Sequence, residues 1–295
     1  MRIGNMTSTL GVRRETGEKI HPNEVVRRCA AAGFEVMDVN LCGLHRGPGP
    51  FRGEGWKKAA EELRNEAEKC GVRFVQSHLP YRSMSMQCDV DLFKTAEGAE
   101  KYRQLSLRAI EITHILGAEW AVIHPMNDRD AVVGDNEAHI KYNLRILDRE
   151  IDLCHKLNVG LAFENIFDQF HLRRFGMRAK ELMQLIDYCN DPLIEACWDV
   201  GHGNLTMDEQ AAGIRVLGNH IKALHIHDNN GKDDLHVMPF TGTVQWEKVM
   251  NAMYESGCKA DLVFETGFSG MPDHLKDPAL ETLKHIGDTL ISMYK

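Results

Sequence analysis

The feature that most constrains the fold is an alternation of short β-branched segments with longer segments of helical periodicity, repeated eight times along the 295 residues. Each unit starts with a run typical of a buried strand, passes through a polar turn, and continues as a helical pattern that ends near a glycine. The predicted strands are Arg2–Met6, Phe34–Asn40, Val72–His78, Glu119–Pro125, Val159–Asn165, Ile194–Val200, His220–His227 and Asp261–Thr266. Because neighbouring parallel strands need a crossover connection, this alternation predicts a parallel sheet.

The segments between the strands have the apolar spacing of amphipathic helices. One stripe, with steps of three and four residues, comprises Tyr102, Leu105, Ala109, Ile112 and Leu116. Gly117 follows it, where a left-handed residue ends a helix. A second stripe predicts one continuous helix from Ile140 to Leu157. Pro22 suits the first turn of a helix that ends at Gly33, and another helix is expected from Trp56 to Cys70.

The number and length of the units decide between the α/β architectures. At about 37 residues per unit, closure into a single (β/α)₈ TIM barrel is favoured over an open doubly wound sheet. No GxGxxG follows a strand, so nothing supports a dinucleotide site. No Pro/Gly-rich linker divides the chain, and we expect one α/β barrel domain over residues 1–295. The Gly/Pro-rich segment 42–55 is too glycine-rich to be helical, and its role as a lid or a subunit contact is left open.

Composition and charge narrow the classes of function. The net charge of −8 argues against a nucleic-acid partner held by general electrostatics, which needs a basic face. No apolar run approaches the roughly 18 residues of a membrane span, and the amino terminus has no signal-peptide stretch. We therefore expect a cytoplasmic protein without a membrane partner. The eight cysteines form no CxxC pair, which disfavours a disulfide framework and a thiolate zinc site.

Residue types that bind metals end the predicted strands from the third to the eighth. They are His78, His124, Glu164, Asp199, His202, His225, His227 and Glu265, with Asp234 and His236 following the seventh strand. Taken singly, such a histidine is usually hydrogen-bonded within the structure and such a glutamate is solvated. A barrel, however, gathers all eight carboxyl ends around one mouth. Four carboxylates and several imidazoles crowded there would repel one another or take up protons without a cation, so the joint pattern predicts a divalent metal site.

These residues also form motifs that resemble a known family, the sugar-phosphate isomerase/epimerase branch of the xylose isomerase-like barrels, which shares its fold with endonuclease IV. The motifs are F-E-N at 163–165, W-D-V-G-H at 198–202, H-x-H-D at 225–228, D-x-H at 234–236, G-T-V-x-W at 242–246 and F-E-T at 264–266. Each is weak alone, but together they stand in the expected order on the expected strands. The resemblance covers almost the whole chain.

The resemblance implies a metal and its ligands. In the epimerases one metal is held from strands five to eight, which here gives Glu164, Asp199, His225 and Glu265. His225 is preferred to His227 because family members have a histidine three residues before an acidic residue, here Asp228. Such an oxygen-rich set suits Mn²⁺ first, then Mg²⁺, with Co²⁺ and Zn²⁺ as alternatives.

The implied activity is isomerisation or epimerisation of a sugar or sugar phosphate next to its carbonyl, through an enediolate. Glu164 and Glu265 are the expected acid and base, and His202 corresponds to a family histidine that touches a substrate oxygen. Arg173 and Arg174, after the fifth strand, either bind a phosphate or carboxylate or are solvated. The sequence leaves open which sugar is used and whether it carries phosphate. The family suggests dimers or tetramers.

Endonuclease IV, a three-zinc enzyme that acts on abasic DNA, is the alternative. Its further ligands have counterparts here in His78, His124, His202, Asp234 and His236, which we expect to bind sugar hydroxyls or a second metal ion. Two departures disfavour the nuclease. The loop after the second strand lacks the Gln/Arg/Trp-containing segment that reads DNA, and the H-P-G-S motif is replaced by His124-Pro125-Met126-Asn127. A third alternative is a barrel that binds a sugar without catalysis.

Overall fold

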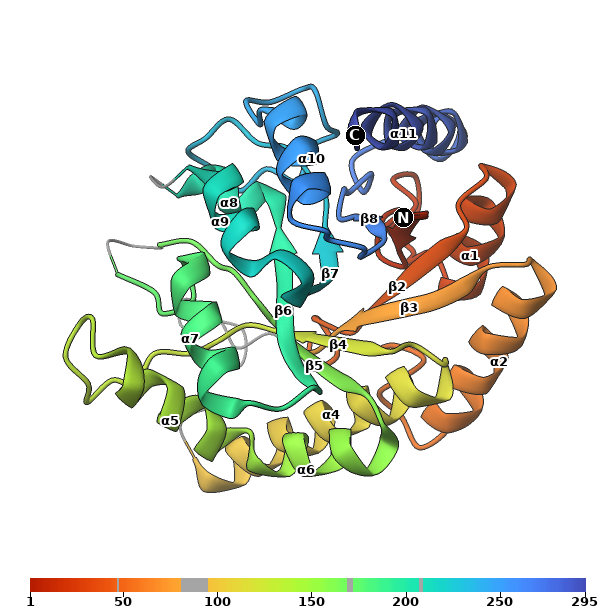
Figure 1. Ribbon diagram of the computed structural model, residues 1–295. Coiled ribbons are helices and arrows are strands. Elements are labelled where there is room, and N and C mark those ends of the chain that lie inside the picture. The colour runs from red at the N-terminus through yellow and green to blue at the C-terminus, as the bar shows by residue number, and fades with distance from the viewer. Residues whose placement is uncertain (47, 81–94, 169–171, 207–208) are drawn as a thin grey trace.

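The computed structural model describes residues 1–46, 48–80, 95–168, 172–206 and 209–295, in which eight parallel strands form one sheet (Figure 1). The strands are β1 (Ile3–Met6), β2 (Val36–Asn40), β3 (Arg73–His78), β4 (Trp120–Ile123), β5 (Gly160–Glu164), β6 (Ile194–Asp199), β7 (Ile221–His225) and β8 (Leu262–Phe264). Their hydrogen-bonded order is β7-β6-β5-β4-β3-β2-β1-β8.

The remaining gap, between β7 and β8, is bridged just beyond the end of β7. The Ile226 amide donates to the Val263 carbonyl at 2.8 Å, and the Glu265 amide donates to the Ile226 carbonyl at 3.0 Å. The sheet is thus a nearly closed barrel with helices between its strands, and the predicted (β/α)₈ TIM barrel is confirmed.

The helices lie around the outside of the barrel (Figure 1). They are α1 (Pro22–Ala31), α2 (Trp56–Lys69), α4 (Ala96–Ile115), α5 (Asn136–Ile146), α6 (Asp148–Leu157), α7 (Ala179–Cys189), α8 (Val200–Leu205), α9 (Gln210–Leu217), α10 (Trp246–Glu255) and α11 (Asp273–Met293), with a 3₁₀ turn at Gly218–His220. None of the helices in the described ranges is both long and apolar enough to cross a bilayer.

The prediction of one helix from Ile140 to Leu157 is wrong, because the helix is interrupted at Leu147. That residue leaves the helical region, with φ −107° and ψ 14°, and α6 starts afresh after it with acidic residues in its first turn. The Ile151 amide still donates to the Leu147 carbonyl at 2.8 Å. The apolar stripe therefore stays in register across the break, which is why the sequence did not reveal it.

The barrel interior just below its mouth is filled by small side chains. A buried cluster there consists of Val122, Ala162, Cys197 and Ala223. Side chains two positions apart on a strand face the same side, so these four share a face with the residues that follow them by two, namely His124, Glu164, Asp199 and His225. Small residues in this layer leave the space above them to longer polar side chains.

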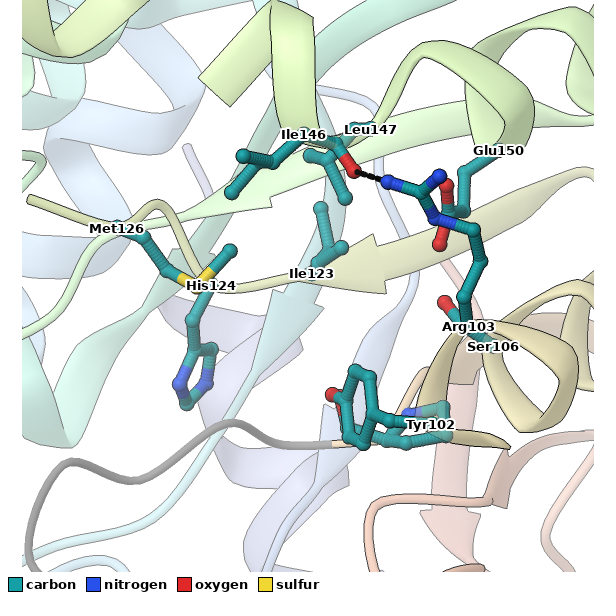
Figure 2. A pocket seen from close by; sticks show the side chains of 10 residues that line it. Tyr102, Arg103, Ser106, Ile123, His124, Met126, Ile146, Leu147 and Glu150 are labelled. Carbon is teal, nitrogen blue, oxygen red and sulfur yellow. Dashed lines mark hydrogen bonds between the residues drawn. The ribbon is translucent and has the colours of Figure 1, made fainter. Parts of the chain in front are cut away.

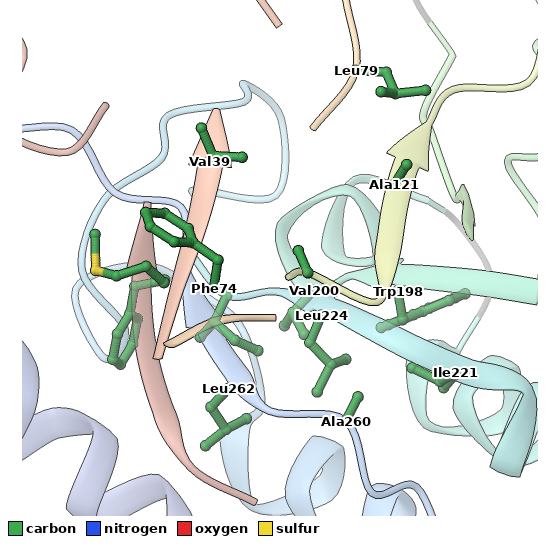
Figure 3. Packing of buried hydrophobic residues seen from close by; sticks show 14 of the residues in the cluster. Val39, Phe74, Leu79, Ala121, Trp198, Val200, Ile221, Leu224, Ala260 and Leu262 are labelled. Atoms are coloured by element: carbon green, nitrogen blue, oxygen red, sulfur yellow. The ribbon is translucent and has the colours of Figure 1, made fainter. Parts of the chain in front are cut away.

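The outer faces of the strands pack against the helices as one large apolar core (Figure 3). Trp198 on β6 belongs to it, with 3% exposure, and its indole nitrogen donates to the Gln210 side chain of α9 at 3.1 Å. Trp198 therefore packs on the barrel wall. The segment 42–55 forms turns and bends, with Gly47 outside the described residues, and Leu44 and Phe51 anchor it in the core.

Candidate metal centre

The four side chains expected to hold a metal converge at the carboxyl end of the barrel. Glu164, Asp199 and His225 end β5, β6 and β7, and Glu265 directly follows β8. Each offers a ligand atom, and these four atoms lie within 4.8 Å of one another. His225 Nδ1 lies 2.8 Å from Glu164 Oε1 and 3.4 Å from Glu265 Oε2. The side chains of Glu164, Asp199 and His225 are fully buried, and that of Glu265 is 17% exposed.

The second oxygen of Glu164 faces two histidines from the neighbouring strands. Glu164 Oε2 lies 3.3 Å from His78 Nε2 and 2.8 Å from His124 Nε2. These three residues form another group whose ligand atoms lie within 4.8 Å of one another. Glu164 therefore stands between two adjacent groups of metal-binding side chains.

A third group lies on the other side of Asp199. His227 Nε2 is 3.1 Å from Asp199 Oδ1, while His202 lies 3.6 Å from both Asp199 and Asp234. His236 Nε2 is 3.1 Å from Asp234 Oδ2, and its ring stacks on His227 at 4.0 Å between centroids. The structure thus brings together the ten metal-binding residues found at or after the ends of the predicted strands. His227, to which the sequence preferred His225 as the ligand, is one of them, and the H-x-H alternation puts it on the same face as His225.

The histidines present a defined nitrogen to the centre. His78, His202 and His236 each donate Nδ1–H to a backbone carbonyl, at 2.8, 2.9 and 2.8 Å respectively. The Nε2 atom of each ring then faces a carboxylate of the site, Glu164 for His78 and Asp234 for His202 and His236. The backbone of the strand ends therefore orients these three side chains.

The W-D-V-G-H and F-E-N motifs have a local structural basis. Asp199 caps α8, with its Oδ1 accepting from the His202 amide at 2.6 Å, and this turn carries His202 back over the site. Asn165 ties β5 to β6, because its side chain bonds both the amide and the carbonyl of Asp199, at 2.6 and 2.9 Å. At Gly201 an added Cβ would lie 1.9 Å from His227 Cε1, so only glycine allows the two to approach.

The acidic residue of H-x-H-D has a structural role. The buried Asp228 carboxylate accepts four hydrogen bonds, listed by donor as the amides of Asn229, Phe240 and Val244 and the indole of Trp246, at 2.9 to 3.0 Å. These donors explain the spacing to the G-T-V-x-W turn. Asp228 therefore fixes the loop after β7, which carries Asp234 and His236, onto the end of the strand.

Two buried polar side chains, Asp38 and Gln76, lie beneath His225 and were not predicted from the sequence. Asp38 Oδ2, on β2, is 3.5 Å from His225 Nε2. Gln76, on β3, donates to Asp38 Oδ2 at 3.0 Å and to the Leu224 carbonyl across the barrel at 3.2 Å. Asp38 thus faces the ring nitrogen opposite the one that faces Glu164. The sequence signal was a charged residue inside an otherwise apolar strand.

A family comparison now places the chain. The sequence model of the xylose isomerase-like TIM barrel matches residues 26–288. The chain belongs to this family.

Members and relatives differ widely from the chain in sequence. An uncharacterized protein of Sinorhizobium fredii is 24% identical over 254 residues, covering 82% of this chain and 70% of the relative. The D-psicose 3-epimerase of Enterocloster bolteae is 21% identical over 244 residues, covering 81% and 74%. A crystal structure of a D-psicose 3-epimerase in the presence of D-fructose superposes with a TM-score of 0.73 over 100% of both chains, at 13% identity. At such identities the likeness shows the fold of the family.

The donor chemistry fits a divalent cation of the kind expected for this family. Three carboxylates and one imidazole lie within 4.8 Å of one another and are almost wholly removed from water. Like charges this close in a buried site repel one another unless protons or a cation neutralise them. Oxygen-rich ligand sets suit hard divalent ions. Mn²⁺ and Mg²⁺ therefore fit the residues that are present.

Without a cation, protons balance these charges. Burial raises the pKa of Glu164, but His225 and His124 outweigh burial and hold that pKa well below its usual range. Burial lowers the pKa of His225, yet the adjacent Cys197, Glu164 and Glu265 raise it well above its ordinary value. Burial dominates elsewhere, raising the pKa of Glu265 and lowering that of His124 to about 4. A metal that binds here must displace protons.

The stability of the metal-free protein is expected to fall as pH rises from 6.5 towards 9. Burial lowers the pKa of His236, but the Asp234 carboxylate and nearby acids raise it to about 9 in the folded chain, against about 6.5 when unfolded. A raised pKa contributes stability that is complete below the unfolded value and is lost as pH passes the folded one. Thermal unfolding in a chelator between pH 6 and 9.5 measures the slope. His236→Gln is expected to flatten it, and an equal slope in this variant would contradict the assignment.

Asp38→Asn is expected to weaken Mn²⁺ binding by about 10- to 100-fold, because a neutral amide no longer orients and polarises the His225 ring from below. Calorimetric titration with MnCl₂ measures the affinity. Asp261→Asn is the matched control, since Asp261 pairs with Arg2 at 2.7 Å at the amino end of β8. Equal affinities for the two variants would show that Asp38 has no influence on the centre.

The cavity over these residues has a volume of about 160 Å³. Its lining comprises Cys42, His78, His124, Glu164, Ile166, Phe167, Arg174, His202, Asp234, His236 and Glu265. On the other side of His124 lies a separate pocket of about 20 Å³, with His124 at one end and Arg103, hydrogen-bonded to the Ile146 carbonyl, at the other (Figure 2). That pocket is too small for a sugar, so the larger cavity is the candidate substrate site.

The two arginines after β5 have different surroundings. Arg173 is paired with Glu181 and with the Arg174 carbonyl, so it belongs to the loop itself. Arg174 instead lines the cavity. The sequence could not separate these two neighbours.

Proposed function

We propose that this chain is a divalent-metal-dependent isomerase or epimerase that moves a proton next to the carbonyl of a sugar or sugar phosphate. The observation that carries the proposal is that Glu164 and Glu265, from strands three apart, both reach one buried imidazole and both line the same 160 Å³ cavity. The names of relatives such as D-psicose 3-epimerase agree with this class of reaction.

The proposed metal ligands are Glu164, Asp199, His225 and Glu265, and Mn²⁺ is the proposed ion, with Mg²⁺, Co²⁺ and Zn²⁺ as alternatives. When bound, such an ion supplies Lewis-acid stabilisation of the negative charge that develops on a substrate oxygen. The chain's own residues carry the proton. One carboxylate, Glu164 or Glu265, removes a proton from the carbon beside the carbonyl, and the other returns a proton to the enediolate.

The result depends on where the proton returns. Return to the opposite face of the same carbon gives an epimer, while return to the neighbouring carbon interconverts an aldose and a ketose. His202, with Nδ1–H held by the Asn165 carbonyl, directs Nε2 at the cavity and orients a substrate oxygen. His78 and His124 bind hydroxyl groups or, together with Glu164, a second ion.

A second candidate function is a multi-zinc phosphodiesterase related to endonuclease IV. The observation in its favour is that the groups His78–His124–Glu164 and Asp199–His202–His227 each bring ligand atoms within 4.8 Å of one another, beside the four-residue group. The departures in sequence at 42–55 and 124–127 stand against it.

Deuterium exchange separates these functions. Protein loaded with Mn²⁺ is incubated in D₂O with a panel of ketoses and ketose phosphates, and incorporation beside the carbonyl is followed by NMR. Incorporation into one or more sugars supports the isomerase, whereas nicking of abasic DNA without any exchange supports the nuclease. Neither activity in a metal-loaded sample that still binds a ketose would indicate a barrel without catalysis.

A further inference from the structure

Arg174 is a buried cation for which the described part of the chain provides no partner. Its side chain is 6% exposed and lines the cavity above the metal-binding residues. Across the described ranges of the chain, the side chain of Arg174 makes no hydrogen bond and no ion pair, and its Nε is fully enclosed. The neighbouring Arg173 shows the contrast, because its guanidinium is taken up by Glu181.

The loop that carries Arg174 is held in place by hydrogen bonds. The Arg174 amide donates to Asp168 Oδ1 at 2.8 Å. The Asn127 side chain hydrogen-bonds the residues before and after Arg174. It donates to the Arg173 carbonyl and accepts from the Phe175 amide, each at 2.9 Å. With the backbone fixed in this way, the position of Arg174 at the cavity wall is built into the fold.

A guanidinium in this position is stabilised by a bound anion. Arginine stays charged at any physiological pH, and a buried charge is costly unless it is paired. The three carboxylates that line the cavity already face imidazoles. Glu164 faces His124 and His225, and Glu265 also faces His225. Asp234 faces His236. The planar fork of donors matches the two oxygens of a carboxylate or phosphate.

We propose that Arg174 binds an oxyanion carried by the substrate, so that the substrate is a phosphorylated or carboxylated sugar and not a neutral one. This inference rests on the proposed function, whose substrate it narrows. Phosphate and carboxylate share the chemistry that Arg174 recognises. The metal-binding residues hold the reacting end of the sugar, and Arg174 holds its charged end in the same cavity.

Binding measurements with matched ligands test this. The Mn²⁺-loaded protein is titrated calorimetrically with D-fructose, D-fructose 1-phosphate, D-fructose 6-phosphate, D-fructuronate and inorganic phosphate. The charged ketoses are expected to bind about 100-fold more tightly than D-fructose, as a charge-assisted bidentate pair implies. The tighter of the phosphate and carboxylate series identifies the natural oxyanion.

Variants assign the preference to Arg174. Arg174→Met is expected to remove this preference, so that charged ketoses bind no more tightly than D-fructose, and Arg174→Lys to restore part of the preference by retaining the charge. Arg215→Met is the control, since Arg215 pairs with Glu255 on the outer surface. If Arg174→Met does not fold, as judged by circular dichroism, Arg174→Lys alone decides, because loss of the fork is still expected to weaken binding of the charged ketoses.

The outcomes separate this inference from the proposed function. Deuterium exchange into D-fructose that Arg174→Met leaves unchanged, together with equal affinity for neutral and charged ketoses, keeps the isomerase and overturns the anion site. A preference for charged ligands that Arg174→Met abolishes, without exchange into any sugar, keeps the anion site and overturns the isomerase. Absence of measurable binding of every charged ligand, inorganic phosphate included, also overturns the anion site.

Discussion

Glu164→Gln is expected to lower the turnover of any sugar that the protein isomerises by about 10²- to 10⁴-fold, while the barrel stays folded. The amide has the same shape but accepts no proton at neutral pH. It also removes the charge that His78, His124 and His225 all face, at 2.8 to 3.3 Å. Turnover is measured as deuterium incorporation beside the substrate carbonyl, and folding by circular dichroism and thermal unfolding.

A matched control distinguishes chemistry from damage to the barrel. Glu195→Gln makes the same change on β6, where Glu195 is 9% exposed and pairs with His220 at 2.7 Å near the amino end of the strand. It is expected to leave turnover within about twofold, since it is remote from the cavity. Proton exchange that Glu164→Gln leaves unchanged would refute the assignment of Glu164 as an acid or base.

The fold was predictable because one physical pattern repeats eight times. Buried parallel strands need β-branched runs and amphipathic helices need apolar stripes, and both periods are visible in the sequence. The break at Leu147 was not visible, because the Ile151 amide keeps its helical bond to Leu147 and the stripe continues in register. A helix interruption that leaves the apolar pattern unchanged cannot be predicted from that pattern.

The candidate site was predictable to the extent that it lies at strand ends. A barrel brings the carboxyl ends of all its strands to one mouth, so the approach of Glu164 and Glu265 to one another follows from the fold. Asp38 lies within a strand, and its meaning depends on facing inward beneath His225, which the register of β2 decides. The position of the Arg174 side chain depends on the path of a loop, which the periodicities of strands and helices do not predict.

Removing the metal is expected to abolish turnover completely, and restoring Mn²⁺ to recover it. The protein is treated with EDTA, dialysed, assayed by deuterium exchange, and then titrated with MnCl₂. Loss occurs because the remaining carboxylates and histidines can exchange protons but supply no Lewis acid for the oxygen that gains charge. Exchange at full rate in a sample shown by elemental analysis to be free of divalent ions would contradict metal dependence.

The same titration tests the metal centre without any substrate. A ligand that binds only the folded state, at a free concentration one hundred times its dissociation constant, stabilises it by about 2.7 kcal/mol, which corresponds to a rise in Tm of about 5 to 10 °C for a chain of this size. Asp199→Asn is expected to suppress the rise, because Asp199 belongs to the four-residue group. The control Asp261→Asn should retain the rise in Tm.

Elemental analysis then counts the ions bound per chain. One ion fits the four-residue group alone, a second ion would be held by His78 and His124, and three ions favour the nuclease-like arrangement. A sample that binds no stoichiometric metal would leave three buried carboxylates balanced by protons alone, and the proposed chemistry would fail with it.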